Sequence, residues 1–494
     1  MGIIIKQSIK GSLWSYLGVL IGFVTTSYLY PNFLTTDLVG LFGLFGAYAT
    51  LFGQFSMLGS AGVTSRLFPY FRDKASGHHG FVAITALFMA VGFSLFLLAY
   101  FLFSPLLMEN NQEKSALFAN YIYLLVPLTF FAMIYTQLDT YNKVLYDAVS
   151  GIFLQDFLQR VFLFLLVMLF AFGLINQHQL VLGYATVISL KGLFILILLY
   201  IRGEIHFRTD FKFINKSFLK EMMDVAAFSI LGGLGTMAVF NIDKIAVNQI
   251  LDLSNTGVYT IAFYFGTLVV IPSRPLLKIS GTLIADAWAE GKLAAIRDIY
   301  YKSCLNQFII GGFLFLGIWA NIHNILIILG DDYVQSKWVI FFIGLGYLFD
   351  MLTGANAQVL SFSKHYRVSL YFVVVLIAVV GVLLYVLTPL WGIVGAAVAV
   401  AAGLFLNNLM RYLFLYRKFR FQPFNYRFLL VALFYIAVYF LLKVLPHLPV
   451  IADVFMRGAL IALLTALFLF LVPVSDEVKR LADRLLKMVP RIRK

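Results

Sequence analysis

The chain has 494 residues, of which 62% are hydrophobic, 12% are charged and 51 are Phe. Its mean hydropathy is +0.92. Because so few polar residues cannot cover a soluble globule of this size, the composition excludes a soluble protein and indicates an integral membrane protein.

Long apolar runs separated by short polar breaks predict a series of membrane-spanning helices. A hydrocarbon core of roughly 30 Å takes about 20 helical residues per crossing, and about fourteen runs approach that length. In chain order they are residues 12–31, 38–60, 80–104, 118–138, 152–175, 179–201, 222–250, 254–275, 303–322, 337–359, 366–387, 391–412, 425–445 and 454–474. Transmembrane β-strands would be short and would alternate apolar with polar residues, which these runs do not do. The predicted fold class is an all-α polytopic membrane protein.

Lysine and arginine residues are concentrated on one side of the predicted membrane. They gather in both terminal segments and in every second break, whereas the other breaks hold only Lys114, Lys337, Lys443 and Arg457. By the positive-inside rule, both termini are expected in the cytoplasm. This topology accounts for the formal charge of +14. Since the charge is not gathered into one basic module, it does not indicate a nucleic-acid partner.

Two stretches of the sequence resemble each other. Leu34-Thr-Thr-Asp-Leu-Val-Gly-Leu-Phe42 and Leu251-Asp-Leu-Ser-Asn-Thr-Gly-Val-Tyr259 lie about 217 residues apart, and each leads from a polar outer break into an apolar span. The spacing predicts two six-helix lobes of the same orientation, related by a pseudo-twofold axis along the membrane normal. The predicted parts are an N-lobe with spans one to six (1–201), a cytoplasmic linker (202–220), a C-lobe with spans seven to twelve (221–416), spans thirteen and fourteen (417–474) and a cytoplasmic amphipathic tail on the membrane surface (475–494).

Charged residues within the predicted spans are the first candidates for a functional site. An ionisable side chain near the bilayer centre costs about 2.5 to 3.5 kcal/mol on insertion scales, so it implies a cavity, a partner or a function. In span five, Asp156 and Arg160 have the spacing of an i,i+4 pair, and Lys191 lies near the middle of span six. The alternatives are a salt bridge at the cytoplasmic rim for the pair and snorkelling for Lys191.

Further candidates follow in the second half of the chain. Asp243 and Lys244 lie in the outer part of span seven, where the alternative is a tilted helix whose end protrudes from the membrane. Asp350 lies in span ten, and Arg411 follows two asparagines at the end of span twelve. These residues are expected to face other helices, since lipid would not solvate them.

The sequence predicts neither an enzyme nor a metal site. No Gly-x-x-x-x-Gly-Lys-Ser/Thr phosphate loop occurs, so ATP hydrolysis is not expected. Cys304 is the single cysteine, and His78-His79 falls in a polar break, where solvated side chains are expected. No Ser, His and Asp set is evident, so we assign no catalytic residue.

Four motifs, in this order, resemble the polysaccharide-biosynthesis flippases of the multidrug/oligosaccharidyl-lipid/polysaccharide (MOP) exporter superfamily. They are Ile5-Lys-Gln-Ser-Ile-Lys-Gly-Ser-Leu-Trp-Ser-Tyr16, Thr64-Ser-Arg-Leu-Phe-Pro-Tyr-Phe-Arg-Asp73, Asn241-Ile-Asp-Lys244 and Thr256-Gly-Val-Tyr-Thr-Ile-Ala262. The resemblance covers nearly the whole chain. It implies two six-helix lobes around a central cavity that opens alternately to the two sides of the membrane.

The resemblance also implies a substrate and a place in the cell. Members similar to this chain move oligosaccharides linked to undecaprenyl pyrophosphate across the bacterial inner membrane, for the synthesis of surface polysaccharide or lipopolysaccharide. The energy comes from the membrane potential or from Na+ or H+ as coupling ion. Membrane lipids, a polysaccharide polymerase and glycosyltransferases are the partners it suggests, and no organic cofactor is expected.

A lipid-linked oligosaccharide carries a pyrophosphate, which favours Arg or Lys in a cavity of low dielectric. The candidate substrate-binding residues are Arg160, Lys191 and Lys244, with Arg66 and Arg274 at the cytoplasmic mouth of the two lobes. The candidates for coupling an ion or setting the local charge are Asp156, Asp243 and Asp350.

Two alternative functions stay open at this point. The first is an ion-coupled antiporter of drugs or other small molecules in the same superfamily, which would be expected to rely more on buried carboxylates without nearby bases. The second is a membrane scaffold of a glycan-assembly complex that transports nothing. A scaffold has no need of charged residues at membrane depth.

Overall fold

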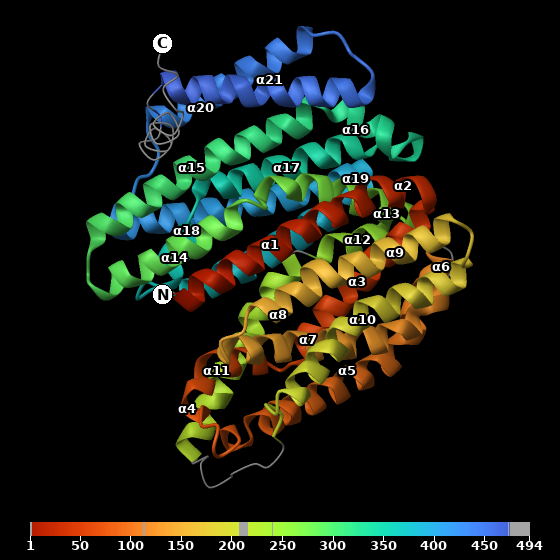
Figure 1. The fold of residues 1–494 in the computed structure, drawn as a ribbon, viewed down its shortest axis with the longest axis vertical. Coiled ribbons are helices and arrows are strands. Elements are labelled where there is room, and N and C mark those ends of the chain that lie inside the picture. The colour runs from red at the N-terminus through yellow and green to blue at the C-terminus, as the bar shows by residue number, and fades with distance from the viewer. Residues whose placement is uncertain (1, 112–113, 207–215, 240, 473, 475–494) are drawn as a thin grey trace, which may run out of the picture. The chain divides into compact units, whose positions relative to one another are not determined.

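A computed structural model of the chain describes residues 2–111, 114–206, 216–239, 241–472 and 474. Over these residues the ribbon consists of helices joined by loops and contains no strand, as Figure 1 shows. The all-α prediction is therefore confirmed. The predicted amphipathic tail (475–494) and much of the predicted linker lie outside the described residues.

The chain divides into two compact units, Met1–Ile261 and Ala262–Lys494. The α-helices of unit 1 are α1 (Gly2–Val24), α2 (Tyr30–Phe33), α3 (Thr36–Ser56), α4 (Ser60–Phe71), α5 (Phe81–Asn111), α6 (Ala116–Tyr121), α7 (Leu125–Val144), α8 (Val149–Ile152), α9 (Gln159–Ala171), α10 (Gln177–Ile201), α11 (Lys216–Val239) and α12 (Ile242–Ile250). Helix α13 (Leu253–Thr267) begins in unit 1 and ends in unit 2. Unit 2 continues with α14 (Ser273–Ala289), α15 (Leu293–Ala320), α16 (Ile322–Leu329), α17 (Ser336–Thr353), α18 (Asn356–Ser361), α19 (Val368–Phe419), α20 (Tyr426–Val444) and α21 (Val450–Leu471).

Twelve helical segments within the described residues are long and apolar enough to span a membrane. One of them, α19, has 52 residues, roughly 78 Å if straight, against a hydrocarbon core of roughly 30 Å. Gly392 interrupts it at φ 59°, a conformation that favours glycine. A Cβ on Gly403 would lie 2.2 Å from the side chain of Val380, so the two halves fold back as an antiparallel hairpin. These halves are the predicted spans 366–387 and 391–412.

The predicted span 222–250 corresponds to two helices. They are α11 and α12, and residue 240 between them lies outside the described residues. With this span added and α19 counted as two, the helices agree with the fourteen predicted spans.

The boundary between the two units does not coincide with the predicted linker at 202–220. Helices α11 and α12 and the first turns of α13, which the sequence places in the C-lobe, belong to the same compact unit as α1–α10. The predicted division into two repeats with two further spans stays a prediction.

Aromatic side chains form the core at one end of unit 1. Phe68 of α4 lies 5.3 Å from Phe81 and 5.1 Å from Tyr141 of α7, measured between ring centroids, and all three are buried. Such pairs contribute about 0.5–1.5 kcal/mol each beyond their buried area. This core holds α4, α5 and α7 together.

The core of unit 2 joins the last two helices to α15. The Tyr435 hydroxyl of α20 donates a hydrogen bond of 2.7 Å to the Ile309 carbonyl, which α15 leaves accessible beside Gly312. Phe434 of α20 stacks on Phe468 of α21 at 4.1 Å between centroids. The hairpin α20–α21 is therefore an integral part of this unit.

Candidate functional site

Lys191, predicted at mid-membrane, lies inside unit 1 with its ammonium group over an aromatic ring. Its Nζ is 4.8 Å from the centroid of Tyr135, which α7 supplies, in cation–π geometry. The Tyr135 hydroxyl donates a hydrogen bond of 2.9 Å to the Gly151 carbonyl of α8, which orients the ring. Among the described residues, no carboxylate lies within 4.0 Å of the ammonium nitrogen. Its three N–H donors are therefore available to a ligand.

Asp139, one turn after Tyr135 on α7, brings a buried carboxylate to the same place. Its Oδ2 pairs with Lys143 on the same helix, and the side chain is only 7% exposed. The Oδ1 atom is buried without a hydrogen-bond partner, and it faces Gly151. Because a Cβ on Gly151 would lie 1.7 Å from Oδ1, only glycine leaves room for the carboxylate.

Asp156 lies on a π-helical segment, η4 (Phe153–Leu158), that precedes α9. Ser15 of α1 donates a hydrogen bond of 2.9 Å to Asp156 Oδ2. Helix α1 approaches this segment closely, since a Cβ on Gly18 would lie 1.6 Å from the Asp156 carbonyl oxygen. Both Asp139 and Asp156 interact electrostatically with Lys191, so candidates from spans five and six lie near each other.

The alternative reading of Asp156 and Arg160, a salt bridge between them, is not what the described residues show. Among the described residues, Arg160 has no ion pair within 4.0 Å, and its guanidinium packs against α1, with Nη1 3.1 Å from the position of a Cβ on Gly22. Asp156 lies in the π-helical segment, where Ser15 is its hydrogen-bond partner, and Arg160 lies in the first turn of α9. The two side chains therefore form no ion pair with each other.

The charges of this cluster do not balance. We use the name charged cluster for Asp139, Lys143, Asp156 and Lys191 together with Arg160, one turn after Asp156. It holds three bases and two carboxylates. In a medium of low dielectric an unbalanced positive charge attracts an anion strongly. The arrangement can therefore hold an anionic group through Lys191 and Arg160.

Asp243 of α12 lies in a hydrogen-bonded environment, and its predicted role in coupling an ion or setting local charge stays a prediction. It is fully buried, accepts a hydrogen bond of 2.7 Å from the Tyr259 hydroxyl, and accepts another of 2.9 Å from the backbone N–H of Lys244. The bond from Tyr259 joins α12 to α13. Lys244 is half-buried on the same helix, and its assignment to the substrate stays a prediction.

Arg66 and Arg274 are both exposed. Arg66 lies on α4 of unit 1 and Arg274 at the start of α14 in unit 2. Neither joins the charged cluster through a described hydrogen bond or ion pair. Their predicted place at a cytoplasmic mouth stays a prediction.

Asp350 lies in a second polar cluster, in unit 2. Asn408 donates a hydrogen bond of 2.9 Å to its Oδ1 and accepts hydrogen bonds of 2.9 Å from Thr353 and from Asn356. Arg411, one turn along α19, interacts electrostatically with Asp350, while its Nε is buried without a hydrogen-bond partner. Asp350 is thus paired with hydrogen-bond donors and a nearby base.

Two acidic residues with structural or functional consequences were missed. Asp139 follows the predicted end of span four at residue 138, and its i,i+4 spacing from Lys143 is the sequence signal that points to it. Asp453 and Arg457 form a buried ion pair of 2.9 Å within α21, and Asn324 donates a further hydrogen bond of 2.7 Å to Asp453. The sequence places Arg457 in an outer break, because hydropathy alone does not distinguish a paired charge from a solvated one.

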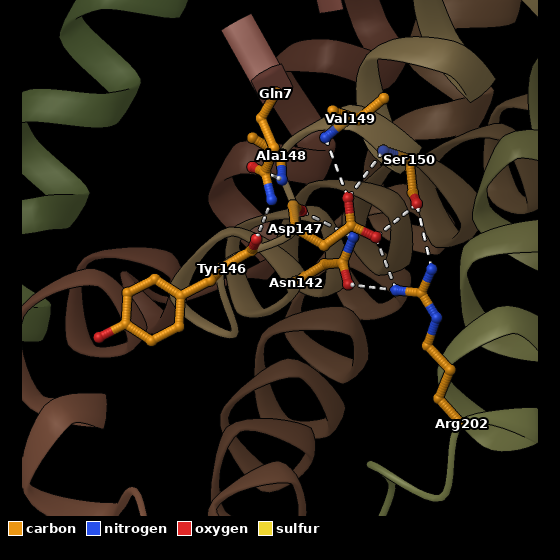
Figure 2. Close-up of polar contacts among 8 residues, drawn as sticks. All are labelled: Gln7, Asn142, Tyr146, Asp147, Ala148, Val149, Ser150 and Arg202. Atoms are coloured by element: carbon orange, nitrogen blue, oxygen red, sulfur yellow. Dashed lines mark hydrogen bonds and ion pairs between the residues drawn. The ribbon is translucent and has the colours of Figure 1, made fainter. Parts of the chain in front are cut away.

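A polar network, drawn in Figure 2, ties together the ends of four helices of unit 1. Asp147 accepts hydrogen bonds from the backbone N–H groups of Val149 and Ser150, and Arg202 at the end of α10 pairs with its Oδ2 at 2.6 Å. Gln7 of α1 contacts the same loop at the Tyr146 carbonyl, while the Tyr146 ring points away.

This network changes the acidity of Asp147. Burial by itself would raise the pKa of Asp147, but the hydrogen bonds from Ser150 and Arg202 outweigh burial, so the pKa is lower than usual. The carboxylate therefore stays ionised at neutral pH and joins α8 to α10.

The two similar sequence motifs meet each other within unit 1. A Cβ on Gly40 would lie 2.1 Å from the Leu253 carbonyl oxygen, and one on Gly257 would lie 1.9 Å from the Thr36 carbonyl oxygen. The hydroxyl oxygens of Thr36 and Ser254 lie 2.7 Å apart and share a hydrogen bond. The contact is reciprocal. Each motif places a backbone carbonyl against the glycine of the other motif, and that carbonyl belongs to the residue four positions before its own glycine. We call it the glycine contact.

Comparisons with known proteins bear on the fold. The sequence matches no protein-family profile and no curated protein. Among solved structures, the lipid II flippase MurJ in an inward closed conformation aligns over 94% of this chain and 99% of its own, with 13% identity and a TM-score of 0.72. An inward-facing multidrug resistance MATE transporter of the MOP superfamily aligns over 81% and 93%, with 16% identity and a TM-score of 0.59. A MATE protein in a straight conformation aligns over 83% and 94%, with 17% identity and a TM-score of 0.52. The chain is thus a multi-pass membrane protein with the fold of these transporters.

Proposed function

We propose that this protein is a flippase of the MOP type that moves an oligosaccharide linked to undecaprenyl pyrophosphate across the bacterial inner membrane. The observation that carries the proposal is the charged cluster, where Lys191 and Arg160 have no carboxylate within ion-pair distance although two lie nearby. Pyrophosphate supplies the anionic charge that this cluster lacks. The likeness to the lipid II flippase over nearly the full length of both chains supports the same class of substrate.

The cluster is suited to bind a phosphate group and to release it. Lys191 rests on Tyr135 and is not held in an ion pair, so binding an anion breaks no salt bridge. Arg160 presents a planar guanidinium that matches phosphate oxygens, whereas Lys191 offers a compact charge. The nearby Asp139 and Asp156 weaken the hold on the anion, which a transporter needs if it is to let its substrate go.

Alternating access requires a contact that closes one side of the protein. The glycine contact is a candidate for it, because both motifs lie at the predicted outer ends of their helices. With the outer side closed, the substrate enters from the cytoplasmic leaflet. Outward movement of a negative charge also follows the membrane potential, which contributes about 2.3 kcal/mol per charge for 100 mV.

The direct test is transport in reconstituted vesicles with a fluorescent lipid-linked oligosaccharide. We expect Lys191→Ala and Arg160→Ala to reduce the transport rate at least tenfold while the protein stays folded and membrane-inserted. Lys302→Ala is the matched control, since Lys302 forms a surface i,i+4 pair with Asp298 in the other unit. Wild-type rates in both cluster variants would refute the assignment of the site.

An ion-coupled antiporter is the second candidate, and the likeness to MATE transporters favours it. It predicts dye efflux that depends on Na+ or H+ and does not depend on lipid-linked oligosaccharide. We rank it lower because each of the predicted carboxylates Asp156, Asp243 and Asp350 has a base nearby.

A further inference from the structure

Unit 1 contains an apolar cavity of about 340 Å³ between α3, α5 and α7. Phe96 and Leu125, which are 2% and 0% exposed, form its floor, and Ala99 lines the wall between them and the surface. Phe55 and Phe103 also line the cavity and are 38% and 58% exposed, so it opens between them. No lining side chain is charged.

The chemistry of the cavity excludes water as its occupant. A buried water needs two to four polar partners, and the lining offers none apart from the hydroxyl of Tyr100. An empty space of this size would leave the surrounding side chains without contacts that a packed interior provides. Apolar cavities of even half this volume bind hydrocarbons such as benzene.

The position of the cavity defines which hydrocarbon can reach it. The lining residues of α5 run from Phe96 to Leu107, about 16 Å along the helix axis, within a predicted membrane span. The opening past Phe55 and Phe103 therefore lies at the depth of the lipid tails. An elongated chain that enters from the membrane fits both the length and the lining.

A positive charge lies at the end of α5 toward which the cavity runs. Lys114 follows this helix by three residues, is exposed, and is held near the end of α12 by a hydrogen bond of 3.2 Å to the Ile250 carbonyl. Lys114 lies in a predicted outer break next to this span, the depth at which the phosphates of the outer leaflet lie, and a phosphate and a lysine attract each other. Charge and apolar lining thus match the two parts of one phospholipid.

We infer that the cavity between α3, α5 and α7 binds one acyl chain of a bilayer phospholipid, whose phosphate lies near Lys114. The bound chain fills the space that the side chains leave and so stabilises unit 1. This site is separate from the charged cluster, and the inference does not depend on the transported substrate.

The first experiment fills the cavity from the protein side. We expect Ala99→Trp to retain about one phospholipid fewer per molecule than wild type when the purified full chain is measured by native mass spectrometry. Its melting temperature should rise less than that of wild type when phospholipid is added in detergent. Leu102→Trp is the matched control on the same helix, because Leu102 is 65% exposed and does not line the cavity. Ala99→Leu fills less of the space and should have an intermediate effect.

A second measurement uses the wild-type protein and does not depend on any variant folding. A phospholipid with a photoreactive group in its acyl chain should label the peptide that contains Phe96 to Leu107, and Lys114→Gln should lower labelling by an anionic phospholipid. Labelling that avoids this peptide, or equal lipid retention in wild type and both Ala99 variants, would overturn the inference. Either result is independent of transport activity.

Discussion

The glycine contact yields the sharpest prediction, because backbone atoms are involved and cannot move aside by rotation about a side-chain bond. In Gly40→Ala, the new Cβ would lie 2.1 Å from the Leu253 carbonyl oxygen and 3.1 Å from the Gly257 nitrogen, whereas ordinary contacts begin at 3.4 Å. Helices α3 and α13 must therefore separate by about 1 Å, which breaks close packing. Overpacking of this kind costs about 1–3 kcal/mol.

That free energy acts on a conformational equilibrium if the contact closes the outer side. A cost of about 1–3 kcal/mol corresponds to a roughly 5- to 150-fold shift of population away from the closed state. Gly257→Ala should act in the same direction, since its Cβ would lie 1.9 Å from the Thr36 carbonyl oxygen.

The assay is disulfide formation between Thr36→Cys and Ser254→Cys in a background with Cys304→Ala. The two native hydroxyl oxygens lie 2.7 Å apart, so the pair suits a disulfide in the closed state. We expect rapid cross-linking that blocks transport, and slower cross-linking once Gly40→Ala is added. Gly46→Ala on the same helix is the control, because nothing lies within 4 Å of its Cβ. Equal cross-linking rates with Gly40→Ala and Gly46→Ala would refute the reasoning.

Three further predictions concern stability. In Gly151→Ala, the new Cβ would lie 1.7 Å from Asp139 Oδ1, so the carboxylate must move. We expect the free energy of unfolding to fall by roughly 1–3 kcal/mol and transport to slow, and an unchanged melting temperature would contradict this contact. Because folding lowers the pKa of Asp147, its ionised form stabilises the fold above about pH 4, and this stabilisation is lost as pH falls through the lowered pKa. Asp147→Asn should therefore be less stable than wild type at pH 7, and the difference should shrink on acidification; a constant difference in melting temperature would argue against it. Asp453→Ala leaves a buried Arg457 unpaired and should cost about 3–5 kcal/mol, whereas the double variant Asp453→Leu/Arg457→Met should recover most of it in thermal unfolding.

Hydropathy predicted the helical architecture well because membrane insertion is decided locally, by the apolar content of about 20 successive residues. The run Val368–Phe419 illustrates both the strength and the limit of this signal. The sequence correctly predicted two spans there. The chain reverses between them at Gly392, whose positive φ favours glycine.

Charges at membrane depth were also visible in the sequence, but their partners were not. Lys191 and Asp156 were predicted as candidates, and the structure brings them to one cluster. The partner of Asp156 is Ser15 of α1, 141 residues away in the sequence, and hydrophobic periodicity does not reveal such a contact.

The sequence by itself determined the fold class, the approximate spans and the existence of two similar motifs, since each depends on residues close together in the chain. Only the tertiary structure showed that Gly40 and Gly257 meet, that Gly151 makes room for Asp139, and that α12 packs with unit 1. These contacts join segments 12 to 217 residues apart. Each close approach needs a glycine in one segment, whose missing side chain leaves space, and atoms of a distant segment that occupy this space. The candidate site is therefore a product of packing between helices, to which the sequence contributed its charges.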